Sequence, residues 1–116
     1  MPMKSNMVLK NAIVNGVLTD VTIRDGKIAS IGKTDEAVYD CQGYTLRPGL
    51  IDIHTHGCGG YDTMDSPIED LALWQKAHGV TAFLPTTMTA PMDALIWVCQ
   101  EIPEGEGAHV LGYHLE

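Results

Sequence analysis

The stretch Pro48-Gly49-Leu50-Ile51-Asp52-Ile53-His54-Thr55-His56 is typical of a buried strand that ends in two histidines. Side chains two residues apart in a strand point to the same face, so we expect His54 and His56 to project side by side. Three of the next four residues are glycines, which are expected to end the strand. Two neutral imidazoles that converge at a strand end supply half of a divalent metal site. The alternative is a pair of exposed strand histidines that hold nothing.

From residue 48 onward, predicted strands alternate with predicted helices. Residues 50–54, 80–84 and 109–115 are the expected strands. A first helix is expected to begin at Asp65-Ser66-Pro67, with Asp65 or Ser66 as the N-cap, and to stop at His78-Gly79. A second is expected to begin at Pro91 and to end at Pro103. Strands and helices in this alternation predict right-handed βα units and a parallel sheet.

Residues 1–47 show a different pattern, in which short alternating strands are separated by turns. Residues 8–14 lead into Asn15-Gly16, and residues 20–24 and 27–31 flank Asp25-Gly26. Such dipeptides between apolar runs are strong hairpin signals. A segment of this size is too small to be stable without help from the rest of a protein. The sequence therefore predicts a small, partly covered sheet in residues 1–47 and a second domain in residues 48–116.

The third predicted strand brings a carboxylate to the same end of the sheet as the histidines. If residues 109–115 form one continuous strand, one face carries Val110, Gly112, His114 and Glu116, and the other carries Leu111, Tyr113 and Leu115. We expect the second set to pack against the helices, so that Glu116 points inward at the strand's carboxyl end. Two histidines and one carboxylate suit zinc, iron or another divalent cation. The alternative for Glu116 is a merely solvated residue.

Two further residues could support these metal ligands. Asp52 lies one layer beneath His54 and could accept a hydrogen bond from the second nitrogen of a ligand imidazole. It could instead be a structural partner for Arg47 or for a backbone amide. His114 lies beneath Glu116 in the same way, and could support a ligand or be a satisfied core histidine.

The remaining candidates have simpler structural explanations. Cys58 could be a thiolate ligand, although a small loop residue is the favoured interpretation. Thr86 and Thr87 could line a substrate pocket, or their hydroxyls could cap the end of a strand. His78 is explained by the dipole at a helix C-terminus, and His109 by a solvated strand start.

Composition restricts the partners. Fifteen acidic residues against seven basic ones give a net charge of −8, which disfavours nucleic acid and anionic membrane surfaces. Three scattered cysteines imply no disulfide framework. We find no signal-peptide pattern and no apolar stretch approaching the ~20 residues that span a bilayer. These features indicate a cytoplasmic protein.

Three motifs carry a resemblance to a known family: residues 48–56, His78-Gly79-Val80-Thr81-Ala82-Phe83-Leu84-Pro85-Thr86, and Gly112-Tyr113-His114-Leu115-Glu116. The first resembles the first barrel strand of the amidohydrolase superfamily, and the other two resemble the N-acetylglucosamine-6-phosphate deacetylase family within it. The resemblance implies an α/β fold, namely the first three strands and two helices of a (β/α)₈ TIM-like barrel. Residues 1–47 would be part of a small β-sandwich that strands from the far C-terminus of family members complete. The resemblance covers about the first third of a family member, so we expect a fragment that is inactive alone.

The resemblance also implies a reaction, the metal-dependent deacetylation of N-acetylglucosamine 6-phosphate to glucosamine 6-phosphate and acetate. His54, His56 and Glu116 would hold one or two divalent ions, with zinc the first expectation and iron or another divalent cation the alternatives. The catalytic aspartate would lie beyond residue 116, so no catalytic residue is assigned within the chain. The partner would be a small phosphorylated amino sugar, and the parent enzyme a homo-oligomer.

Two other functions remain open at this point. One is a different amidohydrolase, similar to dihydroorotase or to D-aminoacylase. The other is a non-catalytic metal-binding or assembly module.

Overall fold

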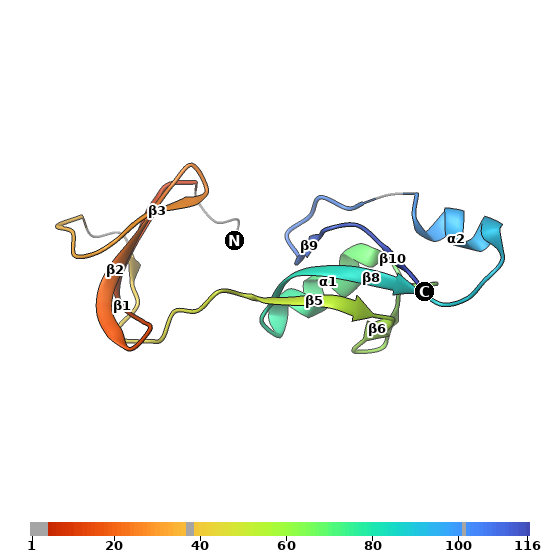
Figure 1. Ribbon diagram of the computed structural model, residues 1–116, viewed down its shortest axis with the longest axis horizontal. Coiled ribbons are helices and arrows are strands. Elements are labelled where there is room, and N and C mark those ends of the chain that lie inside the picture. Colours follow the sequence, from red (N-terminus) through yellow and green to blue (C-terminus); the bar gives the residue numbers. More distant parts are fainter. Residues whose placement is uncertain (1–4, 37–38, 101) are drawn as a thin grey trace. The chain divides into compact units, whose positions relative to one another are not determined.

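The structure is a computed structural model, and it describes residues 5–36, 39–100 and 102–116. The chain divides into two compact units, Met1–Pro48 and Gly49–Glu116, and Figure 1 labels most of their helices and strands. No helix in the described part of the chain combines the length and apolar character needed to cross a membrane.

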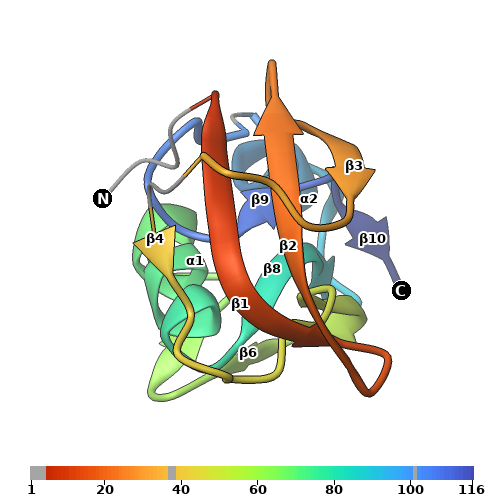
Figure 2. The same ribbon diagram turned by 90° about the vertical axis from the view of Figure 1, so that its left-hand side faces the viewer.

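The first unit is a four-stranded sheet. It contains β1 (Met7–Val14), β2 (Val17–Arg24), β3 (Lys27–Ile31) and β4 (Tyr39–Asp40), in the order β3-β2-β1-β4 (Figure 2). Both predicted hairpins are confirmed, because β1 pairs with β2 and β2 with β3 in antiparallel fashion. In the turns, Asn15-Gly16 and Asp25-Gly26 have positive φ at both positions, as a two-residue type I′ turn requires.

The sheet buries a carboxylate as well as its apolar residues Val8, Ala12, Val21 and Ile23. Asp20 is 0% exposed and accepts hydrogen bonds from the backbone amides of Asn11 and Thr34, each at 2.9 Å. The Nζ atom of Lys10 lies 3.1 Å from the Asp20 carboxylate. These partners, the Asn11 amide foremost, lower the pKa of Asp20 to about 2. The carboxylate is therefore a charged, fully partnered part of the core.

Other apolar side chains of this unit remain uncovered. Val17, Leu18, Ile28 and Ile31 are all more than half exposed. An open, largely apolar groove of about 810 Å³ is lined in part by Val21, Ile23 and Ile28. The described residues of this unit form one sheet rather than two layers, so the β-sandwich stays a prediction.

The second unit is built from parallel strands joined through helices. Its elements are β5 (Leu50–Thr55), β6 (Gly57–Cys58), β7 (Tyr61–Asp62), α1 (Ile68–Ala77), β8 (Val80–Thr87), α2 (Met92–Val98), β9 (His109–Val110) and β10 (His114–Leu115). The central strand β8 pairs in parallel with β5, and also with β9 and β10. The α/β class and the parallel pairing are confirmed. Closure into a barrel stays a prediction.

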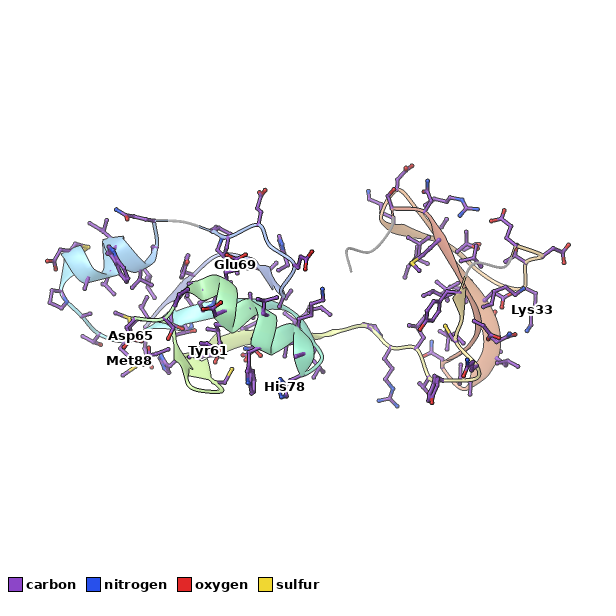
Figure 3. The ribbon with its side chains drawn as sticks, turned by 180° about the vertical axis from the view of Figure 1, so that it is seen from behind. Lys33, Tyr61, Asp65, Glu69, His78 and Met88 are labelled. Carbon is purple, nitrogen blue, oxygen red and sulfur yellow. The ribbon has the colours of Figure 1, made fainter. Side chains whose placement is uncertain are left out.

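The core of this unit lies between α1 and the sheet. Its buried members are Leu71, Ala72, Phe83, Ala108 and Val110. Figure 3 shows α1 from behind, with Glu69 in its first turn and His78 at its end. Gly79, with φ of +88°, follows the last turn, as expected for the C-terminal end of the helix, and the first turn carries the expected acidic side chains.

Two predicted helix boundaries are wrong. Pro67 is the N-cap of α1 and no side chain caps the helix, since the Ser66 hydroxyl instead accepts a hydrogen bond from the Asp62 amide at 2.9 Å. The second helix, α2, ends at Val98 and does not reach Pro103. Because Val98 is its one buried residue, α2 has little packing to extend it.

The predicted continuous strand over residues 109–115 is also wrong. It is interrupted between β9 and β10, where Gly112 has φ of +153°, a conformation that other residues rarely adopt. The interruption changes which side chains face the helices. Val110 is 2% exposed and lies in the core, whereas Leu111 and Leu115, expected there, are 50% and 59% exposed.

Candidate metal centre

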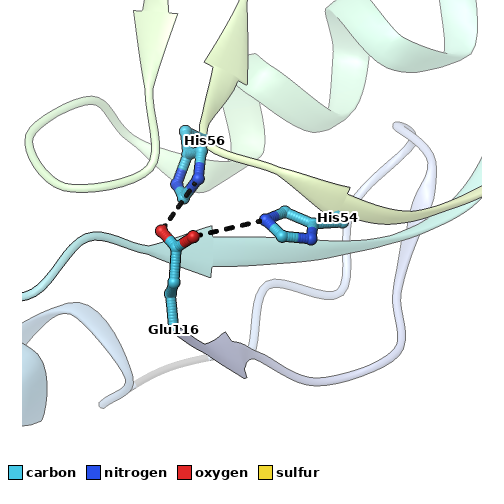
Figure 4. Close-up of side chains that lie close together, drawn as sticks. All are labelled: His54, His56 and Glu116. Atoms are coloured by element: carbon cyan, nitrogen blue, oxygen red, sulfur yellow. Dashed lines mark ion pairs between the residues drawn. The ribbon is translucent and has the colours of Figure 1, made fainter.

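Three predicted ligands meet at one edge of the sheet of the second unit. His56 Nε2 lies 3.1 Å from Glu116 Oε2, and His54 Nε2 lies 4.0 Å from Glu116 Oε1 (Figure 4). One ligand atom from each of the three residues lies within 4.8 Å of the other two. The structure thus brings together the three residues that the sequence nominated.

The convergence follows from the parallel pairing of the strands. Strand β8 pairs with β5 and with β10, so the carboxyl ends of all three lie at the same edge. His54 is near the end of β5, His56 follows it, and Glu116 follows β10. Side chains separated by more than half of the chain therefore face one another.

His56 is held in a form that leaves one nitrogen free to bind a cation. Its Nδ1 atom lies 3.2 Å from the carbonyl oxygen of Thr86, which can only accept a hydrogen bond. In the neutral ring the proton is therefore on Nδ1, which leaves the lone pair of Nε2 for a cation held together with Glu116. The backbone is fixed as well, because the Thr63 amide donates to the His56 carbonyl oxygen at 2.9 Å.

His54 is flanked by two other histidine rings. Its ring centroid lies 5.3 Å from that of His56 and 4.7 Å from that of His114, both in edge-on arrangements. Its backbone amide donates to Asp52 Oδ1 at 3.1 Å, and Asp52 Oδ2 accepts from Gln75 Nε2 at 3.4 Å. Asp52 is thus placed as a partner of a backbone amide, the second of the roles considered for it.

His114 lies beside the ligands without joining them. Its Nδ1 atom is 3.3 Å from the Thr86 hydroxyl, and its ring packs against that of His54. It is half-buried and does not belong to the group of potential ligand atoms. Its role as a support for the ligands stays a prediction.

The three ligands are accessible, and their chemistry fits a divalent cation. The side chains of His54, His56 and Glu116 are 48%, 39% and 46% exposed. Ligand atoms about 2.1 Å from one tetrahedral ion lie roughly 3.4 Å apart, which falls between the two histidine–glutamate distances of 3.1 and 4.0 Å. Three protein ligands leave further coordination positions open to water or substrate, as catalytic zinc sites require.

Cys58 does not take part in this group. It is half-buried in β6, and burial, followed by the charge of Asp52, raises the pKa of its thiol. A protonated thiol is a poor metal ligand. Two other histidines lie outside this group as well. His78 is at the end of α1, where its ring stacks on that of Trp74 with 3.8 Å between the ring centroids. The exposed His109 begins β9.

The threonines of β8 differ from their predicted placement. Thr86 and Thr87 belong to the strand and are each 0% exposed, so neither hydroxyl lines an open pocket. The contacts of Thr86 with His56 and His114 were not anticipated, because no local pattern specifies which residues pair across strands.

The small hairpin of β6 and β7 was also missed, although a signal for it exists. Cys58 and Tyr61 pair across Gly59-Gly60, and two glycines between short strands are a recognised hairpin turn. Gly57 begins β6 with φ of +135°, and a Cβ atom there would lie 2.1 Å from the Tyr61 carbonyl oxygen. Glycine is therefore required directly after His56.

The chain is similar in sequence to characterised deacetylases. It is 37% identical over 102 residues to the N-acetylgalactosamine-6-phosphate deacetylase of Escherichia coli O157:H7, covering 81% of this chain and 27% of that protein. It is 35% identical over 123 residues to the N-acetylglucosamine-6-phosphate deacetylase of Lysinibacillus sphaericus, covering 96% and 32%. No protein-family model matches the sequence. The chain spans about a third of the length of these relatives.

Solved structures give the same result. The N-acetylglucosamine-6-phosphate deacetylase of Thermotoga maritima superposes with a TM-score of 0.73 at 28% identity, covering 94% of this chain and 31% of that one. A D-hydantoinase superposes with a TM-score of 0.69 at 26% identity, covering 95% and 27%. By sequence and by fold, the chain is a homologue of N-acetylglucosamine-6-phosphate deacetylases over about a third of their length.

Proposed function

We propose that the protein carrying this chain is a metal-dependent amide hydrolase that deacetylates N-acetylglucosamine 6-phosphate, releasing glucosamine 6-phosphate and acetate. The observation that carries the proposal is the convergence of His54, His56 and Glu116 within 4.8 Å at the carboxyl edge of a parallel sheet. The names of the relatives supply the substrate class. We place the protein in the cytoplasm, where cysteines stay reduced, because its three cysteines are free. A small phosphorylated sugar is a substrate that such a compartment can supply.

The residues of this chain would bind and orient the metal. When bound, a divalent cation lowers the pKa of a coordinated water and polarises an amide carbonyl, which assists both halves of amide hydrolysis. His54 and His56 would bind it through Nε2, and Glu116 through its carboxylate. The carbonyl oxygen of Thr86 would keep the proton of His56 on Nδ1, away from the ion.

Zinc is the proposed metal, in one or two copies per site. The two oxygens of Glu116 face different histidines, Oε1 toward His54 and Oε2 toward His56, so the carboxylate could join two ions. The general base is proposed to lie outside residues 1–116. Asp52, the aspartate of the strand that carries the histidines, is already engaged by the His54 amide.

The proposal is tested with the intact protein by measuring acetate release from N-acetylglucosamine 6-phosphate. Activity should disappear after chelation and return when Zn²⁺ is restored. A hydantoin serves as a control substrate, because a fold shared with a hydantoinase does not establish which amide is cleaved. Turnover that survives complete metal removal would contradict the proposal.

The 4-epimer of the substrate is a second candidate. A relative at 37% identity is named for N-acetylgalactosamine 6-phosphate, which differs from the glucosamine compound in the orientation of one hydroxyl. Measuring kcat/KM for both sugars in the same preparation decides between them. The proposed assignment requires the larger value for the glucosamine epimer.

A further inference from the structure

Thr86 makes four polar contacts beside the residues of the candidate metal centre. Its hydroxyl lies 3.2 Å from the Thr55 amide nitrogen, 3.2 Å from the Leu84 carbonyl oxygen and 3.3 Å from His114 Nδ1. Its carbonyl oxygen lies 3.2 Å from His56 Nδ1. The residue itself is 0% exposed, so these contacts are shielded from water.

The contacts reach both strands that carry metal ligands. Thr86 is on the central strand β8, which pairs with β5 and with β10. Thr55 directly precedes His56, and His114 lies two residues before Glu116. One buried hydroxyl therefore joins the end of the histidine strand to the end of the glutamate strand.

The available protons fix the direction of each hydrogen bond. The Leu84 carbonyl oxygen can only accept, so it takes the single proton of the Thr86 hydroxyl. The hydroxyl oxygen then accepts from the Thr55 amide and from His114 Nδ1, which must carry its proton. Since His56 also donates from Nδ1 to the Thr86 carbonyl, one residue sets the tautomer of two histidines.

We propose that Thr86 is a positioning residue of the metal centre, whose hydroxyl fixes the spacing between His56 and Glu116. This inference rests on the proposed function, because it needs a metal at His54, His56 and Glu116. Thr86 is fully buried and does not belong to the group of potential ligand residues. Its effect on metal binding is exerted through the Thr55 amide and His114.

The neighbouring threonine provides a matched control. Thr87 is on the same strand and is also 0% exposed, but its hydroxyl has no hydrogen-bond partner among the described residues. Replacing either threonine by valine removes a buried hydroxyl from β8. Only at position 86 does the replacement leave an amide and an imidazole without their partner.

The experiment compares Thr86→Val, Thr86→Ser and Thr87→Val in the intact protein. The affinity for Zn²⁺ is measured by competition with a chelating dye, and the absorption spectrum of bound Co²⁺ reports the geometry of the site. Thr86→Val should weaken Zn²⁺ binding by roughly 10- to 100-fold, the usual effect of losing a group that orients a metal ligand. It should also alter the Co²⁺ spectrum. Thr86→Ser and Thr87→Val should retain the affinity and spectrum of the parent protein.

Two results would overturn the inference: unchanged Zn²⁺ affinity in Thr86→Val, or equal losses in Thr86→Val and Thr87→Val. If Thr86→Val does not fold, ¹⁵N spectra of the histidine rings in the metal-free parent protein decide. The inference requires Nδ1 of His56 and Nδ1 of His114 to carry a proton, and an Nδ1 without a proton in either ring would overturn it. The variant His56→Ala tests the metal site separately from the role of Thr86. Full metal binding by His56→Ala would show that the proposed metal site is wrong, whatever the Thr86 variants do.

Discussion

Two carboxylates, Asp20 in the first unit and Glu116 in the second, both face nitrogen atoms of basic side chains. They differ in how many hydrogen bonds they accept and in how exposed they are. Asp20 in the first unit is fully buried and accepts hydrogen bonds from two backbone amides, with Lys10 alongside. Glu116 in the second unit is 46% exposed, and its oxygens face His54 and His56. A buried carboxylate whose two oxygens both accept hydrogen bonds stabilises a fold, whereas one that faces two imidazoles at an open edge is available to a cation.

The two units also reach their carboxylates by different routes. In the first, consecutive strands pair through tight turns, so Asp20 meets Asn11 across a single hairpin. In the second, β5 and β10 are far apart in the sequence and are brought together by β8. The surroundings of the structural carboxylate Asp20 thus come in part from the neighbouring strand of a hairpin. The candidate metal ligands instead come together only through pairing between strands far apart in the sequence.

The largest expected effect is on metal binding at the open carboxylate. Glu116→Gln should reduce Zn²⁺ affinity of the intact protein by more than about 100-fold, because it replaces a charged ligand by a neutral amide. His54→Ala and His56→Ala should each reduce the metal content per chain, because each removes an imidazole ligand. Metal analysis after gel filtration checks this. A Glu116→Gln protein with full metal content would show that Glu116 does not bind the metal, and the contrast with the structural Asp20 would fail.

A large effect is also expected on association when residues 1–116 are prepared alone. Strand β5 lies at the edge of its sheet, and its Leu50, Ile51 and Ile53 are 64%, 64% and 67% exposed. An exposed apolar edge strand pairs readily with another chain. We expect concentration-dependent association in sedimentation experiments and no acetate release. A concentration-independent monomer with measurable turnover would show that these residues suffice for a closed site.

A smaller effect is expected from Asp20→Asn, and it should be confined to the first unit. The amide cannot match a carboxylate that accepts from two backbone amides and faces Lys10, so thermal stability should fall by several degrees. Hydrogen exchange at the Asn11 and Thr34 amides should accelerate, while Zn²⁺ affinity stays unchanged. Asp35→Asn, at an exposed position, is the control.

The pH dependence of this effect follows from the lowered pKa. Because Asp20 has a pKa of about 2 in the folded chain, below the ordinary 3.8, its ionised form stabilises the fold. That stabilisation is complete above about pH 4 and is lost as the pH falls through about 2. The difference in thermal midpoint between the parent protein and Asp20→Asn should therefore shrink over this range. A constant difference down to pH 2 would show that the carboxylate is not what the core requires.

The smallest effect is expected from Cys58→Ala. The thiol lies near the ligands in sequence, but burial and the charge of Asp52 raise its pKa, and it is not in the ligand group. Metal content and activity should match those of the parent protein. Loss of metal in this variant, with retention in His56→Ala, would reverse the assignment of the ligands.

The sequence predicted the features that depend on local chemistry. The turns at Asn15-Gly16 and Asp25-Gly26 were predictable because few other residues adopt their positive φ angles. The convergence of His54, His56 and Glu116 was predictable because parallel strands present their carboxyl ends at one edge.

Features that depend on packing across the fold were not predictable. The early end of α2 reflects how little of the helix is buried, which no helix signal records. The hydrogen bonds of Thr86 depend on its register with His114 across two strands. Glu116 faces the two histidines as expected, although the continuous strand from which this was inferred does not exist.

The interruption at Gly112 separates two tasks that an unbroken strand would have to combine. Val110, before it, is fixed by the hydrophobic core, and Glu116, after it, is directed toward the histidines. Leu111, between them, is half exposed and contributes nothing to that core. A change in this short connection would therefore alter the reach of the glutamate while leaving Val110 in place in the core.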